Sequence, residues 1–397
     1  MHRRFFRIVI FLLVLLVGIG VFVFLSTRPS ESYIKNSPTN DKTTQISEEK
    51  SVPPKPKIAQ HIKEPEAVKG IYMTAWVAGS RNTAGEFYWR DALAKLIDDT
   101  ELNAIVIDIK DDTGRISFET TSAEVQKFDT GTTRIPDLEA MIEMFHQKGI
   151  YVIGRIAIFQ DPHLVSVRPD LALRRISDGG VWKDRRGLSW LDASSREVWD
   201  YVAAIGKEAY ARGFDEIQFD YLRFPTDGNV KDIAYPFFDA ATQTKADVIT
   251  SFVTHAHTAF SKEGVPFSID VFGQTTTAPD DMGIGQVFGR LILVSDAISP
   301  MVYPSHYGAG YAGYDNPNEH VYEILKYALS EAVNRAVAAS TTPQKIRPWL
   351  QDFDYGGNYD AAKVRAQIQA VEDVGLDSWI LWDPANKYTT EALKPNI

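Results

Sequence analysis

The sequence predicts a (β/α)8 barrel of the TIM type. Eight short apolar runs alternate with amphipathic helical stretches over residues 67–397, and this alternation is typical of parallel strands joined by crossover helices. A doubly wound open sheet is the alternative, but the turn after the first run (WVAGS, 76–80) lacks the glycine pattern of a dinucleotide site. The predicted strands are 70–76, 104–110, 151–159, 216–224, 267–273, 297–303, 346–353 and 378–383.

An apolar segment, 1–25, precedes the barrel. Four basic residues are followed by 8–25, which carries no charge. This length, and the position of the basic residues before it, predict a transmembrane helix that anchors the protein with its bulk outside the cytoplasm. The alternative is a cleaved signal segment followed by secretion, although 26–29 (STRP) is a poor cleavage site.

Residues 26–66 connect this segment to the barrel. They are rich in Ser, Thr, Pro, Lys and Glu and contain few large apolar residues. Such a composition cannot bury enough apolar surface to offset the entropy of ordering the chain. The sequence therefore predicts a disordered linker over 26–66 and a barrel domain over 67–397.

Start and stop signals mark the predicted helices, and one connection is unusually long. A helix over 136–149 precedes the third strand, and another begins at a capping box of Ser194 and Glu197 and ends at Gly213. Between the third strand and Ser194 lies a loop, 160–194. Long loops after barrel strands lie on the face where barrel enzymes build their sites, so we predict that it forms a wall of the substrate site; a decorative insertion is the alternative.

Composition excludes several classes of function. A net charge of −10 argues against nucleic acid as a partner, because no basic face is available to neutralise phosphates. The absence of cysteine excludes disulfides, zinc–thiolate sites and cysteine nucleophiles. No H-E-x-x-H, P-loop or G-x-S-x-G motif is present. We therefore expect no cofactor and no metal, and we read the aspartate pairs 111–112 and 280–281 as solvated loop charges. A Ca²⁺ or Mg²⁺ ion held by one of these pairs is the alternative.

Ionisable residues share the less apolar face of four consecutive predicted strands. In the fourth strand, Gln218 and Asp220 alternate with apolar neighbours, and the second, third and fifth strands show the same pattern at Asp108, Arg155 and Asp270. In a barrel this face lines the lumen, so the four charges should converge near the carboxyl ends of the strands. An internal salt-bridge network is the alternative reading of this set.

Aromatic and polar residues near the ends of the other strands complete the predicted site. An acidic pocket walled by rings suits a neutral or cationic polyhydroxy ligand, and two carboxylates on either side of a glycosidic bond can hydrolyse it. No metal ligand is included. The predicted substrate-binding residues are Asp108, Arg155, Tyr221, Arg223, Tyr303, His306, Trp349, Asp352, Trp382 and Asp383.

Four stretches of the sequence resemble a known family. The runs GRIAIFQDPHL, RPDLAL, GLSWLDASSREVWDY and GFDEIQFDYLRFPTDG are similar to those of the bacterial DUF4015 family of glycoside-hydrolase-like barrels, and the resemblance covers roughly 69–390. It implies a (β/α)8 barrel that hydrolyses a polysaccharide. In related barrels the carboxylate ending the fourth strand is commonly the nucleophile or base, which here is Asp220. The partner acid is predicted to be Asp270, with Asp352, Asp354 and Asp383 as rivals.

These observations predict a membrane-anchored glycoside hydrolase with its catalytic domain outside the cytoplasm. Its expected partners are a polysaccharide or oligosaccharide of the cell envelope or matrix and the membrane, through the N-terminal helix. A barrel of the same fold that binds glycan without cleaving it is the alternative, because inward acids and aromatic rings also suit binding.

Overall fold

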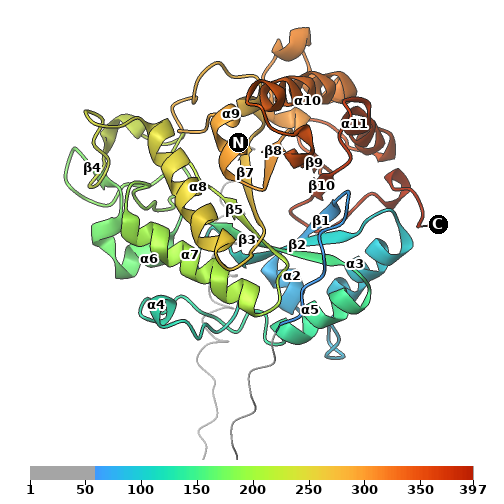
Figure 1. Ribbon diagram of the computed structural model, residues 1–397, viewed down its shortest axis with the longest axis horizontal. Helices are drawn as coiled ribbons and strands as arrows, with labels where there is room; N and C mark the ends of the chain where they lie inside the picture. Colours follow the sequence, from blue (N-terminus) through green and yellow to red (C-terminus); the bar gives the residue numbers. More distant parts are fainter. Residues whose placement is uncertain (1–58, 397) are drawn as a thin grey trace, which may run out of the picture. The chain divides into compact units, whose positions relative to one another are not determined.

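The predicted barrel is present in the computed structural model, which describes residues 59–396. Eight parallel strands close in the order β1-β10-β9-β8-β7-β5-β3-β2 (Figure 1), so the open-sheet alternative is wrong. Each predicted run overlaps one strand of the barrel. The strands are β1 (Lys69–Met73), β2 (Ala104–Lys110), β3 (Tyr151–Ala157), β5 (Glu216–Asp220), β7 (Phe267–Phe272), β8 (Ala297–Met301), β9 (Trp349–Gln351) and β10 (Trp379–Trp382), with a separate two-stranded sheet of β4 (Arg174–Arg175) and β6 (Ile233–Ala234).

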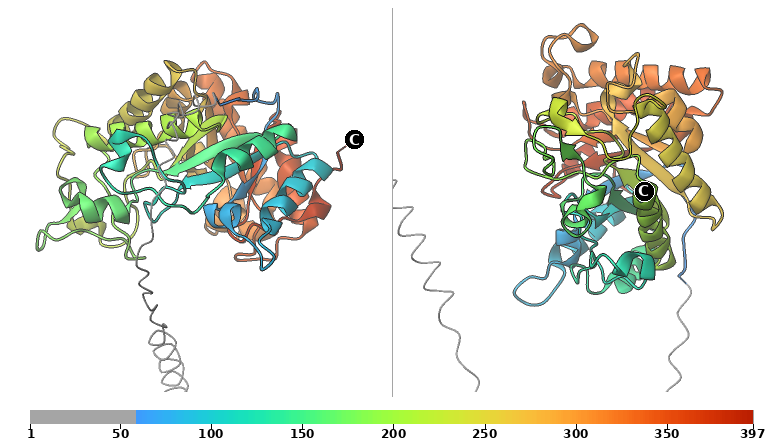
Figure 2. Two further views of the ribbon diagram at one scale, coloured as in Figure 1. Left: turned by 90° about the horizontal axis from the view of Figure 1, so that it is seen from below. Right: turned by 90° about the vertical axis from the view of Figure 1, so that its left-hand side faces the viewer.

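Helices cover the outside of the barrel in every view (Figure 2). The long helices are amphipathic, and each buries an apolar stripe against the strands, as Val198, Val202 and Ile205 do in α7. The long helices are α3 (Tyr88–Asp99), α5 (Leu138–Gln147), α7 (Arg196–Ala211), α8 (Lys245–Ser261), α10 (Val321–Ala338) and α11 (Ala361–Asp373), and the short ones are α2 (Ala75–Gly79), α4 (Ala123–Gln126), α6 (Pro162–Val167) and α9 (Phe288–Leu291).

The helix before the central strand begins one residue later than the sequence predicts. Ser195, not Ser194, is the N-cap of α7, and its hydroxyl accepts a hydrogen bond from the Val198 N–H. Glu197 instead pairs with Arg168, so the predicted capping box does not form. The next strand follows Gly213, whose φ of 116° reverses the chain.

Side chains sort to the two faces of each strand by alternation. Ile105, Ile107 and Ile109 of β2 face the helices and belong to the large outer core, whereas Val106 packs inside the barrel with Ile153 of β3. The alternation predicted from the sequence is confirmed here. The buried residues of the interior cluster are Val68, Tyr72, Ala104, Val106, Tyr151, Ile153, Tyr303, Trp349 and Ile380.

Residues 59–66 pack against the N-terminal end of the barrel, although the sequence places them in the linker. The Ile62 N–H donates to Asp215 Oδ1 at 2.9 Å, and Glu64 pairs with Arg347 at 2.7 Å. The rest of the predicted linker and the predicted transmembrane helix lie outside the described residues. Within 59–396, no helix has the length and apolar character needed to cross a membrane.

Candidate active site

A cavity of about 700 Å³ opens at the carboxyl ends of the barrel strands. Eight of the predicted site residues line it, and the rest of its wall comes from strand ends and from the loops that follow them. The lining residues are Arg155, Asp220, Tyr221, Arg223, Phe272, Gly273, Gln274, Met301, Tyr303, Ser305, His306, Tyr307, Trp349, Phe353, Tyr355 and Trp382.

Asp220 is the last residue of β5 and presents its carboxylate to this cavity. One oxygen, Oδ2, pairs with Arg155, and the other, Oδ1, accepts the Tyr221 N–H at 2.5 Å. That second bond depends on an unusual backbone, because Tyr221 has a φ of 55°, which is rare for a bulky residue and is found mainly where function requires it. The carboxylate is therefore fixed in orientation while part of its surface stays open to a ligand.

Arg155 joins the charged residues that the sequence predicts to converge. Its Nη1 donates to Asp108 Oδ1 at 2.6 Å, its Nη2 pairs with Asp220, and its Nε lies 3.7 Å from Asp270 Oδ2. The Tyr72 hydroxyl donates to the other oxygen of Asp108. Convergence is therefore confirmed, and the salt-bridge reading also holds for Asp108, which is buried behind Arg155 and does not line the cavity.

Asp270 belongs to β7, which pairs with β5, and is not a lining residue. Trp349 Nε1 donates to its Oδ1 at 2.7 Å, whereas its buried Oδ2 has no hydrogen-bond partner. Burial raises the pKa of Asp270 well above its ordinary value, and the negative charge of Asp220 raises it further. Asp270 therefore carries a proton over a pH range in which an exposed aspartate is ionised.

Aromatic side chains form one wall of the cavity. The rings of Tyr303 and Trp382 stack with centroids 5.4 Å apart and an interplanar angle of 24°, and Phe353 meets Trp382 edge-on at 4.9 Å. His306 packs edge-on against Tyr303, and burial lowers the pKa of its imidazole, which favours the neutral form. Flat rings of this kind suit the apolar face of a sugar.

The long loop 160–194 supports the cavity from behind. None of its residues lines the cavity, so the predicted substrate wall is wrong for this segment. Trp190, which is buried, instead packs beneath Arg223 with the guanidinium carbon 4.8 Å from a ring centroid. The loop thus fixes a lining residue without forming the surface itself.

Two further predicted residues, Asp352 and Asp383, also lie outside the cavity. Asp352 accepts hydrogen bonds from the N–H and hydroxyl of Thr389, and burial raises its pKa to about 6. Asp383 accepts the Ala385 N–H at 2.5 Å. Asp352 directly follows β9, and Asp383 directly follows β10. The last residue of each strand points inward, so alternation turns both carboxyls away from the lumen. They shape the chain after β10 instead.

Half of the lining residues were not predicted as site residues. Two of them could have been predicted from strand alternation, because residues two apart on a strand share a face. Phe272 lies two residues after Asp270, and Met301 lies two residues after Ser299. The others lie where the path of the loops decides which side chains enter. The lining residues outside the predicted set are Phe272, Gly273, Gln274, Met301, Ser305, Tyr307, Phe353 and Tyr355.

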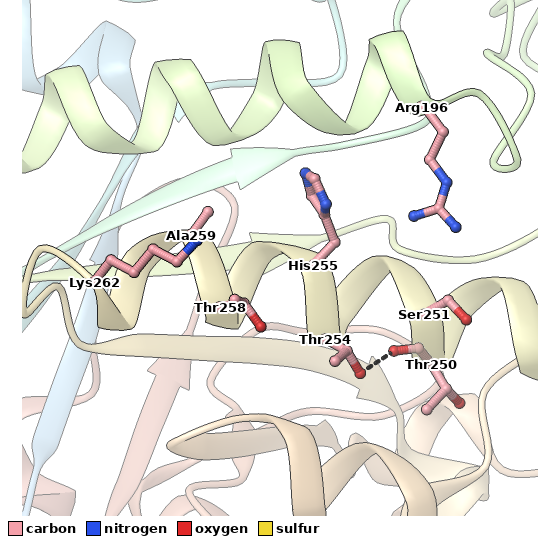
Figure 3. Close-up of a pocket in the computed structure, with 8 residues that line it drawn as sticks. All are labelled: Arg196, Thr250, Ser251, Thr254, His255, Thr258, Ala259 and Lys262. Carbon is pink, nitrogen blue, oxygen red and sulfur yellow. Dashed lines mark hydrogen bonds between the residues drawn. The ribbon is translucent and has the colours of Figure 1, made fainter.

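A second depression lies outside the barrel and contributes nothing to this chemistry. It measures about 410 Å³ and lies between α7 and α8 (Figure 3), lined by Arg196 and by hydroxyl-bearing and basic residues of α8. Arg196 stacks on Trp199 at 3.7 Å, and His255 pairs with Asp200 at 3.0 Å. Over residues 59–396, no group of three or more histidine and acidic side chains is arranged to hold a metal.

Comparison with known proteins assigns the barrel to a family. A family model described as "Putative glycosyl hydrolase domain" matches residues 70–388. The chain belongs to the DUF4015 family. The resemblance predicted from the sequence is thereby confirmed, and the barrel is a member of a glycosyl hydrolase domain family. Among curated proteins, no sequence matches the chain.

Two glycoside hydrolase structures share the fold. The glycoside hydrolase domain of PgaB (BpsB) from Bordetella bronchiseptica matches with a TM-score of 0.61 at 11% identity, over 83% of this chain and 99% of that one. Alpha-L-fucosidase isoenzyme 2 from Paenibacillus thiaminolyticus gives 0.51 at 15% identity, over 82% and 48%. A hypothetical protein from Ruminiclostridium thermocellum is 35% identical over 51% of this chain and 97% of its own, with a TM-score of 0.44.

Proposed function

We propose that the protein hydrolyses O-glycosidic bonds in a polysaccharide of the cell envelope or matrix, with Asp220 facing the anomeric carbon. The observation that carries this proposal is the setting of Asp220. Among the described residues that line the cavity it is the one carboxylate, it ends the fourth barrel strand, and stacked rings line the same cavity. Active sites of TIM barrels are built at this face from residues at strand ends.

The contacts of Asp220 favour the role of nucleophile or base over that of acid. Arg155 and the Tyr221 N–H both donate to its oxygens, and a carboxylate anion is the acceptor that such donors suit. A fixed anion beside the anomeric carbon stabilises the positive charge that develops on the sugar ring in the transition state. No rearrangement of Asp220 is needed for this role.

Asp270 takes a different role from the one that the sequence predicts. Its raised pKa suits a general acid, but its side chain has no exposed surface and is held by Trp349. We assign it as a positioning residue, because its neutral carboxyl fixes the indole of Trp349 at the cavity wall. Because a protonated Asp270 carries no charge, it does not compete with Asp108 and Asp220 for the guanidinium of Arg155.

A barrel that binds glycan without cleaving it is the second candidate. It is favoured by the same cavity, because the described lining residues include one carboxylate and most glycoside hydrolases use two. The aromatic wall would serve binding equally well. The two candidates differ in whether loss of the Asp220 charge abolishes turnover or only weakens retention of the glycan.

Reducing-end release by the full-length chain from a panel of envelope and matrix polysaccharides tests the proposal. Asp220→Asn should lower kcat by about 10³-fold or more, since it removes a charge that acts in the transition state. Asp227→Asn is the matched control, because its carboxylate lies in the loop that follows Asp220 and makes no hydrogen bond or ion pair within the described residues. Retention of a glycan on an affinity gel, with no release by any variant, would support the binding module instead.

We further propose that residues 1–25 anchor the protein in a membrane with the barrel outside the cytoplasm. The support is the sequence alone: an uncharged apolar stretch preceded by a basic cluster. The full-length chain should sediment with membranes, the chain lacking 1–25 should not, and protease added to spheroplasts should digest the barrel. Recovery of the intact full-length chain in the soluble fraction would overturn the anchor.

A further inference from the structure

Arg223 holds a guanidinium among aromatic rings at the cavity wall. It follows β5 by three residues and packs between Trp190 and Phe272, each with its ring centroid 4.8 Å from the guanidinium carbon. Tyr221 contributes a third ring at 5.7 Å. Rings that stack on a guanidinium leave its edges, where the N–H groups point, free for other partners.

One of these edges has no partner in the described part of the chain. Nη1 donates to the Phe224 carbonyl at 3.2 Å and to Thr226 Oγ1 at 3.4 Å, whereas Nε and Nη2 donate no hydrogen bond there. No carboxylate among residues 59–396 lies within 4.0 Å of Arg223. Arg155, by contrast, engages Asp108 and Asp220 with both of its terminal nitrogens.

The unpaired edge has a definite geometry. Nε and Nη2 lie along one edge of the planar guanidinium and present two parallel N–H groups, which match the two oxygens of a carboxylate. Burial lowers the pKa of Arg223, which shows that its surroundings disfavour the charge, although the negative charge of Asp220 acts in the opposite direction. An arriving anion would compensate a cation that the protein leaves without an ion pair.

The charge of the cavity also differs from the one that the sequence suggests. The predicted acidic pocket included Asp108, Asp270, Asp352 and Asp383, and the structure keeps all four out of the cavity. The lining residues that carry a formal charge are Arg155, Arg223 and Asp220. Arg155 is already engaged by both Asp108 and Asp220, so Arg223 is the lining cation that has no ion pair among the described residues.

We propose that Arg223 forms a subsite for the carboxylate of a uronic acid, so that the glycan bound at this site is acidic. This assignment rests on the proposed function and names its substrate class. It replaces the neutral or cationic ligand expected from the sequence. Asp220 and Arg223 line one cavity, so the acidic sugar lies close to the bond that is cleaved.

Binding of a galacturonic acid hexasaccharide to the full-length chain tests the assignment by calorimetry, beside the same hexasaccharide with its carboxyl groups reduced to alcohols. The wild-type chain should bind the acidic form at least about 10-fold more tightly, as hydrogen bonds between charged groups imply. Arg223→Gln should abolish this difference. Arg185→Gln is the matched control for non-specific attraction, because Arg185 is exposed and has no partner among the described residues.

Each other outcome overturns the assignment or part of it. Equal affinity for both forms, no binding of the acidic form, or a preference that survives Arg223→Gln in a variant with unchanged melting temperature would overturn the subsite. A sulfated galactan oligosaccharide bound more tightly than the galacturonic acid form, and lost in Arg223→Gln, would replace the carboxylate by a sulfate ester. Arg223→Lys should restore part of the affinity for either anion, because it keeps the charge and loses the fork.

Failure of this inference can be told apart from failure of the proposed function. Release of reducing ends from a neutral glycan, lost in Asp220→Asn, with no preference for the acidic hexasaccharide, would keep the hydrolase and overturn the subsite. Tight binding of the acidic hexasaccharide that depends on Arg223, without hydrolysis of any polysaccharide, would keep the subsite and overturn the hydrolase.

Discussion

The two ends of the barrel interior each hold an arginine between carboxylates. At the N-terminal end Arg347 bonds Glu216 at 2.8 Å and Glu64 at 2.7 Å, and Glu216 also accepts hydrogen bonds from Tyr151 and Ser268. At the other end Arg155 bonds Asp108 and Asp220 and lies near Asp270. The same residue types thus occur twice, and β5 contributes to both ends.

The two ends differ in how fully their charged groups are paired and in how open these groups are to solvent. Glu216 is buried with each oxygen hydrogen-bonded, and residues 59–66 pack over that end. At the cavity end three carboxyls share one guanidinium, one oxygen of Asp270 lacks a partner, and Asp220 is partly open. Fully satisfied ionic networks specify structure, whereas incomplete ones near a cavity mark chemistry. Substitutions at the two arginines separate these roles.

Arg347→Met should produce the largest loss of stability. It leaves Glu216 buried without its cation, which destabilises a protein by about 3–5 kcal/mol. Denaturant unfolding monitored by tryptophan fluorescence measures the change. The specific activity of the folded fraction should stay at the wild-type level, because nothing in the cavity changes. Equal losses of stability and of specific activity would mean that the two ends are not independent.

Arg155→Met should have the opposite effect, with a large loss of activity and a smaller loss of stability. It removes the donor that orients Asp220, so we expect kcat to fall by about 100-fold. The loss of stability should be smaller than in Arg347→Met, because water in the cavity can solvate Asp220 and the buried Asp108 can take up a proton. Reducing-end assays and denaturant unfolding on the same preparation compare the two variants. An activity near that of wild type would place Arg155 with Arg347 as a structural residue.

Asp270→Asn tests the cavity end through the pH dependence of the free energy of unfolding. The raised pKa of Asp270 means that its contribution to stability is fully present below about pH 4 and is lost as the pH rises through the folded-state value. The free energy of unfolding of the variant should therefore fall less than that of wild type on going from acid to alkaline solution. Its kcat should stay within about 10-fold of wild type, whereas loss of a general acid would lower kcat by about 10²–10⁴-fold.

Glu64→Gln should have the smallest effect. The Glu64 side chain is 48% exposed in its pair with Arg347, and partly exposed pairs contribute about 0.2–1 kcal/mol. A shift of the thermal midpoint by a few degrees, reduced in high salt, is the expected result. A loss as large as that of Arg347→Met would show that residues 59–66 carry most of the stability of that end.

The strands and the inward charges were predictable because alternation is a local property. Asp108, Arg155, Asp220 and Asp270 share one face by position alone, and the structure brings all four together. The same rule, applied to the last two strands, would have excluded Asp352 and Asp383.

Which of the inward side chains reach the cavity was not predictable from the sequence. Alternation gives the face of a strand but not whether a side chain reaches the cavity, so the sequence could not tell Asp220, which lines the cavity, from Asp270, which does not. The lining residues Gln274 and Tyr355 depend on loop paths that no periodic pattern encodes. The ordered segment 59–66 was also missed, because its composition resembles a linker and a few specific contacts hold it.

Strand β5 ties the closed end of the barrel to the cavity. Glu216, Gln218 and Asp220 point the same way along one extended stretch, while Ile217 and Phe219 point toward the helices. A slip of this strand by one residue against its neighbours would exchange the two sets, turning the polar groups outward and the apolar ones inward. The ionic contacts of Glu216 thus help to set the register of the strand that ends in Asp220.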